Sequence, residues 1–148
     1  MPGRSVEPTT ALPRIILFGD SITQGSFDSV SPWGSLLANR YQRRADAVNR
    51  GFSGYNSRWA LHILPSVFPA SDDIPLLVTI FFGANDASLA TEDSKRQHVP
   101  VEEYRENLST AAPPRTHHEA RSPALLPLSV SGPLVSVITA VALGRQNI

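Results

Sequence analysis

Three short motifs, each directly after an apolar run, carry the residues that could do chemistry in this 148-residue sequence. They are Gly19-Asp20-Ser21, the segment NRGFSG at 49–54 and the segment GAND at 83–86. A serine hydroxyl can attack a carbonyl carbon, and glycine amides and an asparagine side chain can donate hydrogen bonds to the oxyanion that forms. The motifs therefore indicate nucleophilic acyl chemistry, with Ser21 in the nucleophile position.

Three strands are expected to position these motifs. The β-branched and apolar runs predict strands at Arg14–Phe18, Ala45–Asn49 and Leu76–Phe82. Helical patterns lie between and after them, so the order is strand, helix, strand, helix, strand, helix. This order predicts an α/β fold with a parallel sheet, in which the carboxyl ends of the strands share one edge and bring the three motifs together.

The helix ends are predicted from caps, prolines and charge. Ser31-Pro32-Trp33 is expected to start the first helix, and Arg40, Arg43 and Arg44 to close its last turns. Asn56 or Ser57 can cap the second helix, which Pro65 and Pro69 are expected to end. The third helix begins at Val101 and is expected to end early, before Pro113-Pro114.

Composition excludes several classes of protein. Thirteen basic and thirteen acidic residues cancel, so no charge pattern favours nucleic acid as a partner. There is no cysteine for a disulfide or a zinc–thiolate site. No stretch is long enough for a membrane span and no signal peptide is evident, so we expect a cytoplasmic protein, of unknown oligomeric state.

The three motifs, in this order, resemble the SGNH (GDSL-type) hydrolase family, and more narrowly its isoamyl acetate-hydrolysing esterase branch. The segments FGDSITQG at 18–25 and NRGFSGYN at 49–56 carry this resemblance, which covers about Arg14 to Leu108. It implies a flavodoxin-like three-layer α/β/α fold that is incomplete here after the third strand. It also implies hydrolysis of a small ester or lipid through an acyl-enzyme, short-chain acetate esters being the expected class, with no metal or other cofactor.

The resemblance assigns roles to individual residues. Ser21 is the expected nucleophile, and the Ser21 amide, the Gly54 amide and the Asn85 side chain are the expected oxyanion hole. Asp20 and Asp86 are expected to brace their loops through backbone hydrogen bonds rather than to do chemistry. Ser21, Gly54 and Asn85 also have simpler explanations. A serine or an Asn-Asp pair can form a turn, and a glycine can adopt a left-handed turn conformation.

The fourth motif of the family, Asp-x-x-His, has no counterpart in this sequence. It supplies the general base and the aspartate that orients it. The residues three positions before His62, His98, His117 and His118 are Trp59, Lys95, Pro114 and Arg115. His98 is the best stand-in because it follows the third strand, although a solvated loop histidine is the favoured explanation. The His117-His118 pair has no further ligands and makes a poor metal site.

Three regions are therefore expected: a flexible arm at 1–13, a partial SGNH hydrolase domain at 14–108 and a Pro-rich, poorly ordered tail at 109–148. The whole looks like the front of an esterase joined to an unrelated tail, as alternative splicing or a shifted reading frame would produce. We expect weak or no ester hydrolysis. The alternative is a non-catalytic product: a pseudoenzyme that binds an ester or a partner, or a non-functional splice form.

The outer edge of the strand Leu76–Phe82 would be open here, because the family places further strands beyond it. An open, apolar edge would pair with other chains. The β-branched run Leu134–Ala142 either covers this edge as a strand or adds a second aggregation-prone segment.

Overall fold

A computed structural model describes residues 12–69, 75–89, 91, 94–111, 126–128 and 137–142. The strands are β1 Arg14–Gly19, β2 Asp46–Gly51, β3 Leu77–Phe82, β4 Leu126–Leu128 and β5 Val137–Ala142. The helices are α1 Ser21–Gln24, α2 Trp33–Arg40, α3 Ser57–Val67 and α4 Val101–Ala111, with a short 3₁₀ turn, η1, at Gly25–Phe27. The three predicted strands are confirmed to within two residues at each end.

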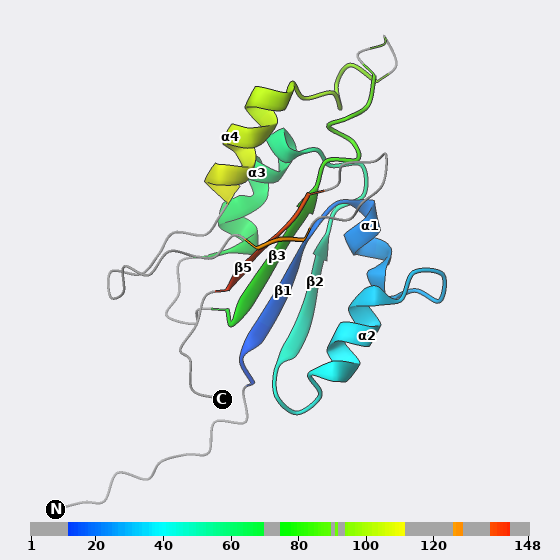
Figure 1. The fold of residues 1–148 in the computed structure, drawn as a ribbon, viewed down its shortest axis with the longest axis vertical. Helices are drawn as coiled ribbons and strands as arrows, with labels where there is room; N and C mark the ends of the chain where they lie inside the picture. The colour runs from blue at the N-terminus through cyan, green and yellow to red at the C-terminus, as the bar shows by residue number, and fades with distance from the viewer. Residues whose placement is uncertain are drawn as a thin grey trace, which may run out of the picture.

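The sheet has the order β2-β1-β3-β5-β4 (Figure 1). β1 pairs in parallel with both β2 and β3, so the central part is the predicted parallel sheet. β5 pairs antiparallel with β3, and β4 pairs antiparallel with β5, which makes the whole sheet mixed rather than purely parallel. β5 thus covers the outer edge of β3, the first of the two outcomes considered for that run.

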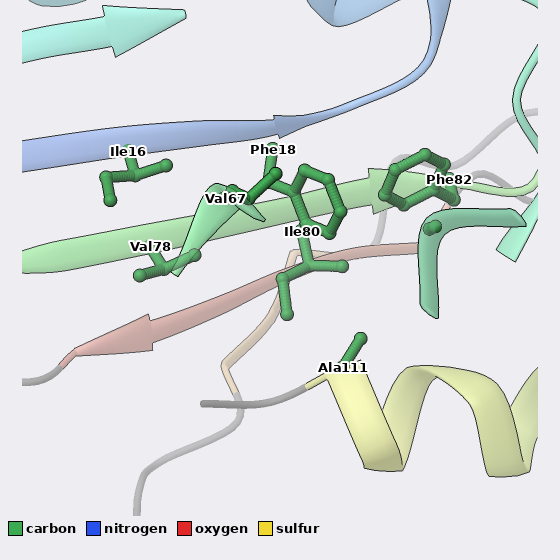
Figure 2. Close-up of a cluster of buried hydrophobic side chains, with 8 residues drawn as sticks. Ile16, Phe18, Val67, Val78, Ile80, Phe82 and Ala111 are labelled. Carbon is green, nitrogen blue, oxygen red and sulfur yellow. The ribbon is translucent and has the colours of Figure 1, made fainter. Parts of the chain in front are cut away.

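Two apolar clusters hold the helices against opposite faces of the sheet. On one face, Ile16, Phe18, Val78, Ile80 and Phe82 pack with residues of α3 and α4 (Figure 2). On the other face, Ile15 and Leu17 pack with Trp33, Leu37 and Tyr41, which lie on or next to α2. The strict alternation along β1 follows from the two-residue period of a strand, and it gives the three-layer α/β/α arrangement.

Phe18 lies at the centre of the first cluster. Its ring makes edge-to-face contacts with Phe82 at a centroid distance of 4.9 Å, with Phe68 at 5.7 Å and with Phe52 at 6.2 Å. These contacts join β1 to β3, to the end of α3 and to the loop after β2. The end of β1, where Ser21 begins the next element, is therefore fixed from three sides.

Three predicted helix ends need correction. α2 is preceded by Pro32, with no side-chain cap, rather than by Ser31. It ends at Arg40, and residues 41–44 form turns in which Arg43 has a φ of +62°, so Arg43 and Arg44 do not lie in its last turns. Pro65 lies inside α3, which continues to Val67. α4 ends at Ala111, before Pro113-Pro114, as the sequence predicts.

No helix in the described ranges is long and apolar enough to cross a bilayer.

Candidate active site

Ser21 is the first residue of α1, directly beyond the carboxyl end of β1. The helix starts there because the Asp20 carboxylate accepts a hydrogen bond from the Ile22 amide at 2.9 Å, which is an N-cap. Ser21 is exposed. Within the described residues, nothing accepts a hydrogen bond from its backbone amide, and its hydroxyl has no hydrogen-bond partner.

Two glycines let α1 lie directly on the strand ends. A Cβ on Gly19 would come within 2.5 Å of the Phe81 carbonyl oxygen, and one on Gly51 would lie 2.0 Å from the Gln24 nitrogen. Asn49 ties the same surfaces together, since its Nδ2 donates to the Thr23 and Gln24 carbonyls at 2.9 and 3.0 Å. The position of the Ser21 helix is therefore set by backbone packing, with no room for a side chain between helix and sheet.

Gly54 lies in the turn between β2 and α3, with a φ of +81° that favours glycine. In the described part of the chain, its amide also has no acceptor. Asn85 lies in the turn after β3, and its Nδ2 donates to the Tyr55 carbonyl at 2.7 Å. An amide nitrogen carries two protons, and the described residues use only one of them on Asn85, so the other N–H is available for a ligand. Gly54 and Asn85 are thus joined through the neighbouring residue Tyr55.

Asp86 is buried and binds the start of α3. Its carboxylate accepts from the Ser57 amide at 2.9 and 3.1 Å and from the Ser57 hydroxyl at 2.5 Å. The Ser57 hydroxyl in turn accepts from Asn107 of α4 at 3.0 Å. This network connects the turn after β3 to both α3 and α4.

Asp20 is 1 % exposed, and its second carboxylate oxygen has no hydrogen-bond partner among the described residues. Burial raises the pKa of Asp20, and the nearby Asp86 adds to this. Burial, with the charges of Asp86 and Asp20, also raises the pKa of Tyr104 to about 12. The hydroxyl of Tyr104 donates to the Phe82 carbonyl at 2.8 Å. Two buried groups with raised pKa values, Asp20 and Tyr104, therefore lie beneath the exposed motifs.

The histidines do not supply a partner for Ser21 in the described structure. His98 Nδ1 lies 2.7 Å from the Ser88 carbonyl oxygen, so Nδ1 carries the proton in that contact. No hydrogen bond joins His98 to Ser21 in the part of the chain that is described. His62 is exposed on α3. The predicted poor metal site His117-His118 lies outside the described residues.

Sequence reasoning missed two residues that organise the site. Asn56 was considered only as a cap, yet its Nδ2 also donates to the Gln97 carbonyl at 2.8 Å while its Oδ1 accepts from Trp59. Gln97 was not singled out, although its side chain reaches the carbonyl of Gly54. Their partners lie about 40 residues away in the sequence, so no local pattern could have indicated them.

Comparison with known proteins places these motifs in a family. Residues 17–133 match the GDSL-like Lipase/Acylhydrolase family. A GDSL esterase/lipase of Arabidopsis thaliana is 51% identical over 136 residues, which are 91% of this chain and 52% of the relative. The human isoamyl acetate-hydrolyzing esterase 1 homolog is 56% identical over 100 residues, 66% of this chain and 40% of its own length.

The solved structures agree with the fold. The SGNH-hydrolase family esterase AlinE4 has a TM-score of 0.52 at 27% identity, over 68% of this chain and 51% of that one. A lipase/acylhydrolase from Enterococcus faecalis has a TM-score of 0.50 at 34% identity, over 68% and 50%. This chain thus spans about half, or less, of the length of the relatives described. The family match and the Arabidopsis match both extend beyond Leu108, the expected end of the resemblance. The chain belongs to the GDSL-like lipase/acylhydrolase family, the SGNH hydrolases.

Proposed function

We propose that this chain carries the nucleophile and the oxyanion hole of a serine esterase that cleaves carboxylic esters, with short-chain acetate-type esters as the substrate class. The relative named for isoamyl acetate hydrolysis supports that class. The observation that carries the proposal is the grouping of Ser21 with donors that have no described acceptor: the amides of Ser21 and Gly54. The second N–H of Asn85 is the third donor.

The reaction proceeds in two steps. The Ser21 hydroxyl oxygen attacks the ester carbonyl carbon, the three donors hold the oxyanion, and the bond to the alkoxy oxygen breaks. The proton from Ser21 passes to a base, and the leaving alkoxide takes up a proton as the alcohol departs. Water then attacks the acyl-enzyme, which releases the carboxylic acid and restores the Ser21 hydroxyl.

No histidine in these 148 residues follows an aspartate by three positions, so these residues hold no counterpart of the family's general base for the Ser21 proton. In another serine hydrolase, loss of the base lowers turnover on the order of 10⁶-fold. The oxyanion hole and substrate binding still give a small residual rate. We therefore propose that a polypeptide of these 148 residues reacts slowly at Ser21 and turns over near background.

A fluorophosphonate probe with peptide mapping tests the proposal, because the probe reports acylation-type attack without needing turnover. We expect slow labelling that maps to Ser21 and disappears in Ser21→Ala. Ser53→Ala is the matched control, because Ser53 is exposed in the neighbouring loop. Labelling that persists in Ser21→Ala, or that spreads evenly over exposed serines, refutes the assignment of the nucleophile.

A further inference from the structure

The loop between β3 and α4 returns to the site and places one side chain between two of its donors. Gln97 Nε2 donates to the Gly54 carbonyl at 3.2 Å and to the Asn85 Oδ1 at 3.5 Å. The same Nε2 lies 3.8 Å from where a Gly54 Cβ would be. One side-chain amide therefore contacts both the turn before α3 and the turn after β3.

Gln97 is itself held in place by a buried side chain. Asn56, which is 0% exposed, donates from Nδ2 to the Gln97 carbonyl at 2.8 Å and to the Arg96 carbonyl at 3.3 Å. The Gln97 amide donates to the Ser94 carbonyl at 2.9 Å. Because the backbone on both sides of the Gln97 side chain is fixed, that side chain approaches the site from a set position.

The contact with Gln97 helps to fix the orientation of the Asn85 side-chain amide. Its amide could face either way about its last torsion, since oxygen and nitrogen occupy similar space. Gln97 offers only a donor toward Oδ1, and the Tyr55 carbonyl offers only an acceptor toward Nδ2. Together they select the orientation in which Oδ1 faces Gln97 and Nδ2 faces the Tyr55 carbonyl, with one N–H of Asn85 not used by either partner.

The consequence for Gly54 is a fixed turn. Gln97 holds its carbonyl, and the preceding Ser53 amide donates to Gln24 Oε1 at 2.8 Å. The Gly54 backbone is therefore tied on its amino side to α1 and on its carboxyl side to Gln97. The direction of its amide, at a φ of +81°, depends on both ties.

We propose that Gln97 is a positioning residue of the oxyanion hole: its side-chain amide holds Gly54 and Asn85 so that both can donate to one oxyanion. This inference rests on the proposed function, in which those two residues are donors. Gln97 touches no reacting atom and acts only through the two residues it holds.

Replacement of Gln97 by glutamate separates this role from simple packing. The variant Gln97→Glu keeps the size of the side chain but, as a carboxylate, faces the Gly54 carbonyl and Asn85 Oδ1 with acceptors only. Asn85 then turns its amide over and gives up the Tyr55 carbonyl. Gln42→Glu is the matched control, because Gln42 Nε2 also donates to an asparagine Oδ1, that of Asn39, at an exposed turn.

The experiment is an NMR measurement on the ¹⁵N-labelled 148-residue chain, following the side-chain amide signals and hydrogen exchange of Asn85. In Gln97→Glu we expect these signals to shift and the amide protons to exchange about fivefold faster or more, the factor that one neutral hydrogen bond is worth. Gln97→Ala, which adds no charge, shows the same direction with an unchanged backbone spectrum elsewhere. The Gln42→Glu variant leaves the Asn85 signals in place.

Two results are decisive, and they separate this inference from the proposed function. Asn85 signals that are unchanged in both Gln97 variants overturn the positioning role, whatever Ser21 does with the probe. The positioning role is supported if the Asn85 signals respond as expected and if fluorophosphonate labelling of Ser21 slows in Gln97→Ala and not in Gln42→Glu. Labelling that maps away from Ser21 refutes the proposed function and is read independently of Asn85.

Discussion

Replacement of Gly51 by alanine tests whether backbone packing sets the position of the Ser21 helix. A Cβ at Gly51 would lie 2.0 Å from the Gln24 nitrogen, 2.3 Å from its Cα and 2.6 Å from the Thr23 carbonyl carbon. All three atoms belong to the backbone of α1, so no side chain can rotate out of the way. α1 must therefore move off the end of β2 by at least 1.0 Å to reach the 3.0 Å below which real Cβ contacts essentially never fall.

The size of the effect follows from what that movement breaks. Forcing a methyl group into a packed site costs about 1–3 kcal/mol. The Asn49 hydrogen bonds to the Thr23 and Gln24 carbonyls, at 2.9 and 3.0 Å, stretch beyond hydrogen-bond length. Each contributes about 1 kcal/mol. We expect Gly51→Ala to lower the free energy of unfolding by about 3–5 kcal/mol, which is a large part of the stability of a small domain.

Urea denaturation followed by circular dichroism measures this, with Gly25→Ala as the matched control on the same segment. Gly25 has a φ of −79°, and its Cβ would meet only the tip of the Asp28 side chain at 3.0 Å. The control is expected to stay within about 1 kcal/mol of the unsubstituted chain. A Gly51→Ala variant as stable as Gly25→Ala would refute the argument that helix and strand end touch through backbone.

Three further predictions concern the polar layer beneath the site. Asp20→Asn keeps an oxygen that can cap Ile22 but has no charge. Because the folded-state pKa of Asp20 is raised, the unsubstituted chain loses stability as pH rises from 3.8 through that raised pKa, so the Asp20→Asn variant should gain stability relative to it as pH rises above 3.8. If the free energy of unfolding of Asp20→Asn differs from that of the unsubstituted chain by the same amount at every pH in this range, this prediction is contradicted. Asp86→Ala leaves the buried Ser57 amide without its acceptor and should cost about 2–5 kcal/mol in urea denaturation, whereas a cost below about 1 kcal/mol would show that the network contributes little. Tyr104, whose pKa is about 12, should remain protonated at pH 10–11 in an ultraviolet titration, and the folded chain should lose stability from pH 10 up to about 12; this slope should be reduced in Tyr104→Phe.

The central strands and the three motifs could be predicted from the sequence because their signals are local. Apolar β-branched runs that stop at glycine give both the strand and the place where a polar side chain leaves the sheet. The parallel pairing of β1 with β2 and β3 then follows from the alternation of strands with helices. Ser21, Gly54 and Asn85 lie at the predicted edge for this reason.

The features that could not be predicted depend on contacts between distant parts of the chain. Gln97 acts on Gly54, 43 residues away, and a glutamine in a polar loop carries no local signal of such a contact. The antiparallel pairing of β5 with β3 joins distant parts of the chain, and no local pattern specifies the direction of such a pair. β4 has only three residues and contains Pro127, which local propensity disfavours in a strand. Pro65 was expected to end α3, yet the apolar contacts of Val67 with the core carry the helix two residues further.

The most direct test of the account is the rate at which Ser21 is acylated by a fluorophosphonate probe as the concentration of added imidazole rises. If the oxyanion hole is formed and only the base is absent from these residues, imidazole from solution accepts the Ser21 proton, and the rate of labelling at Ser21 increases with its concentration. Asn85→Ala should reduce that rate at every imidazole concentration, by about 10²-fold or more. Fast, stoichiometric labelling of Ser21 without imidazole, or imidazole-dependent labelling that is the same in Asn85→Ala, would contradict the account.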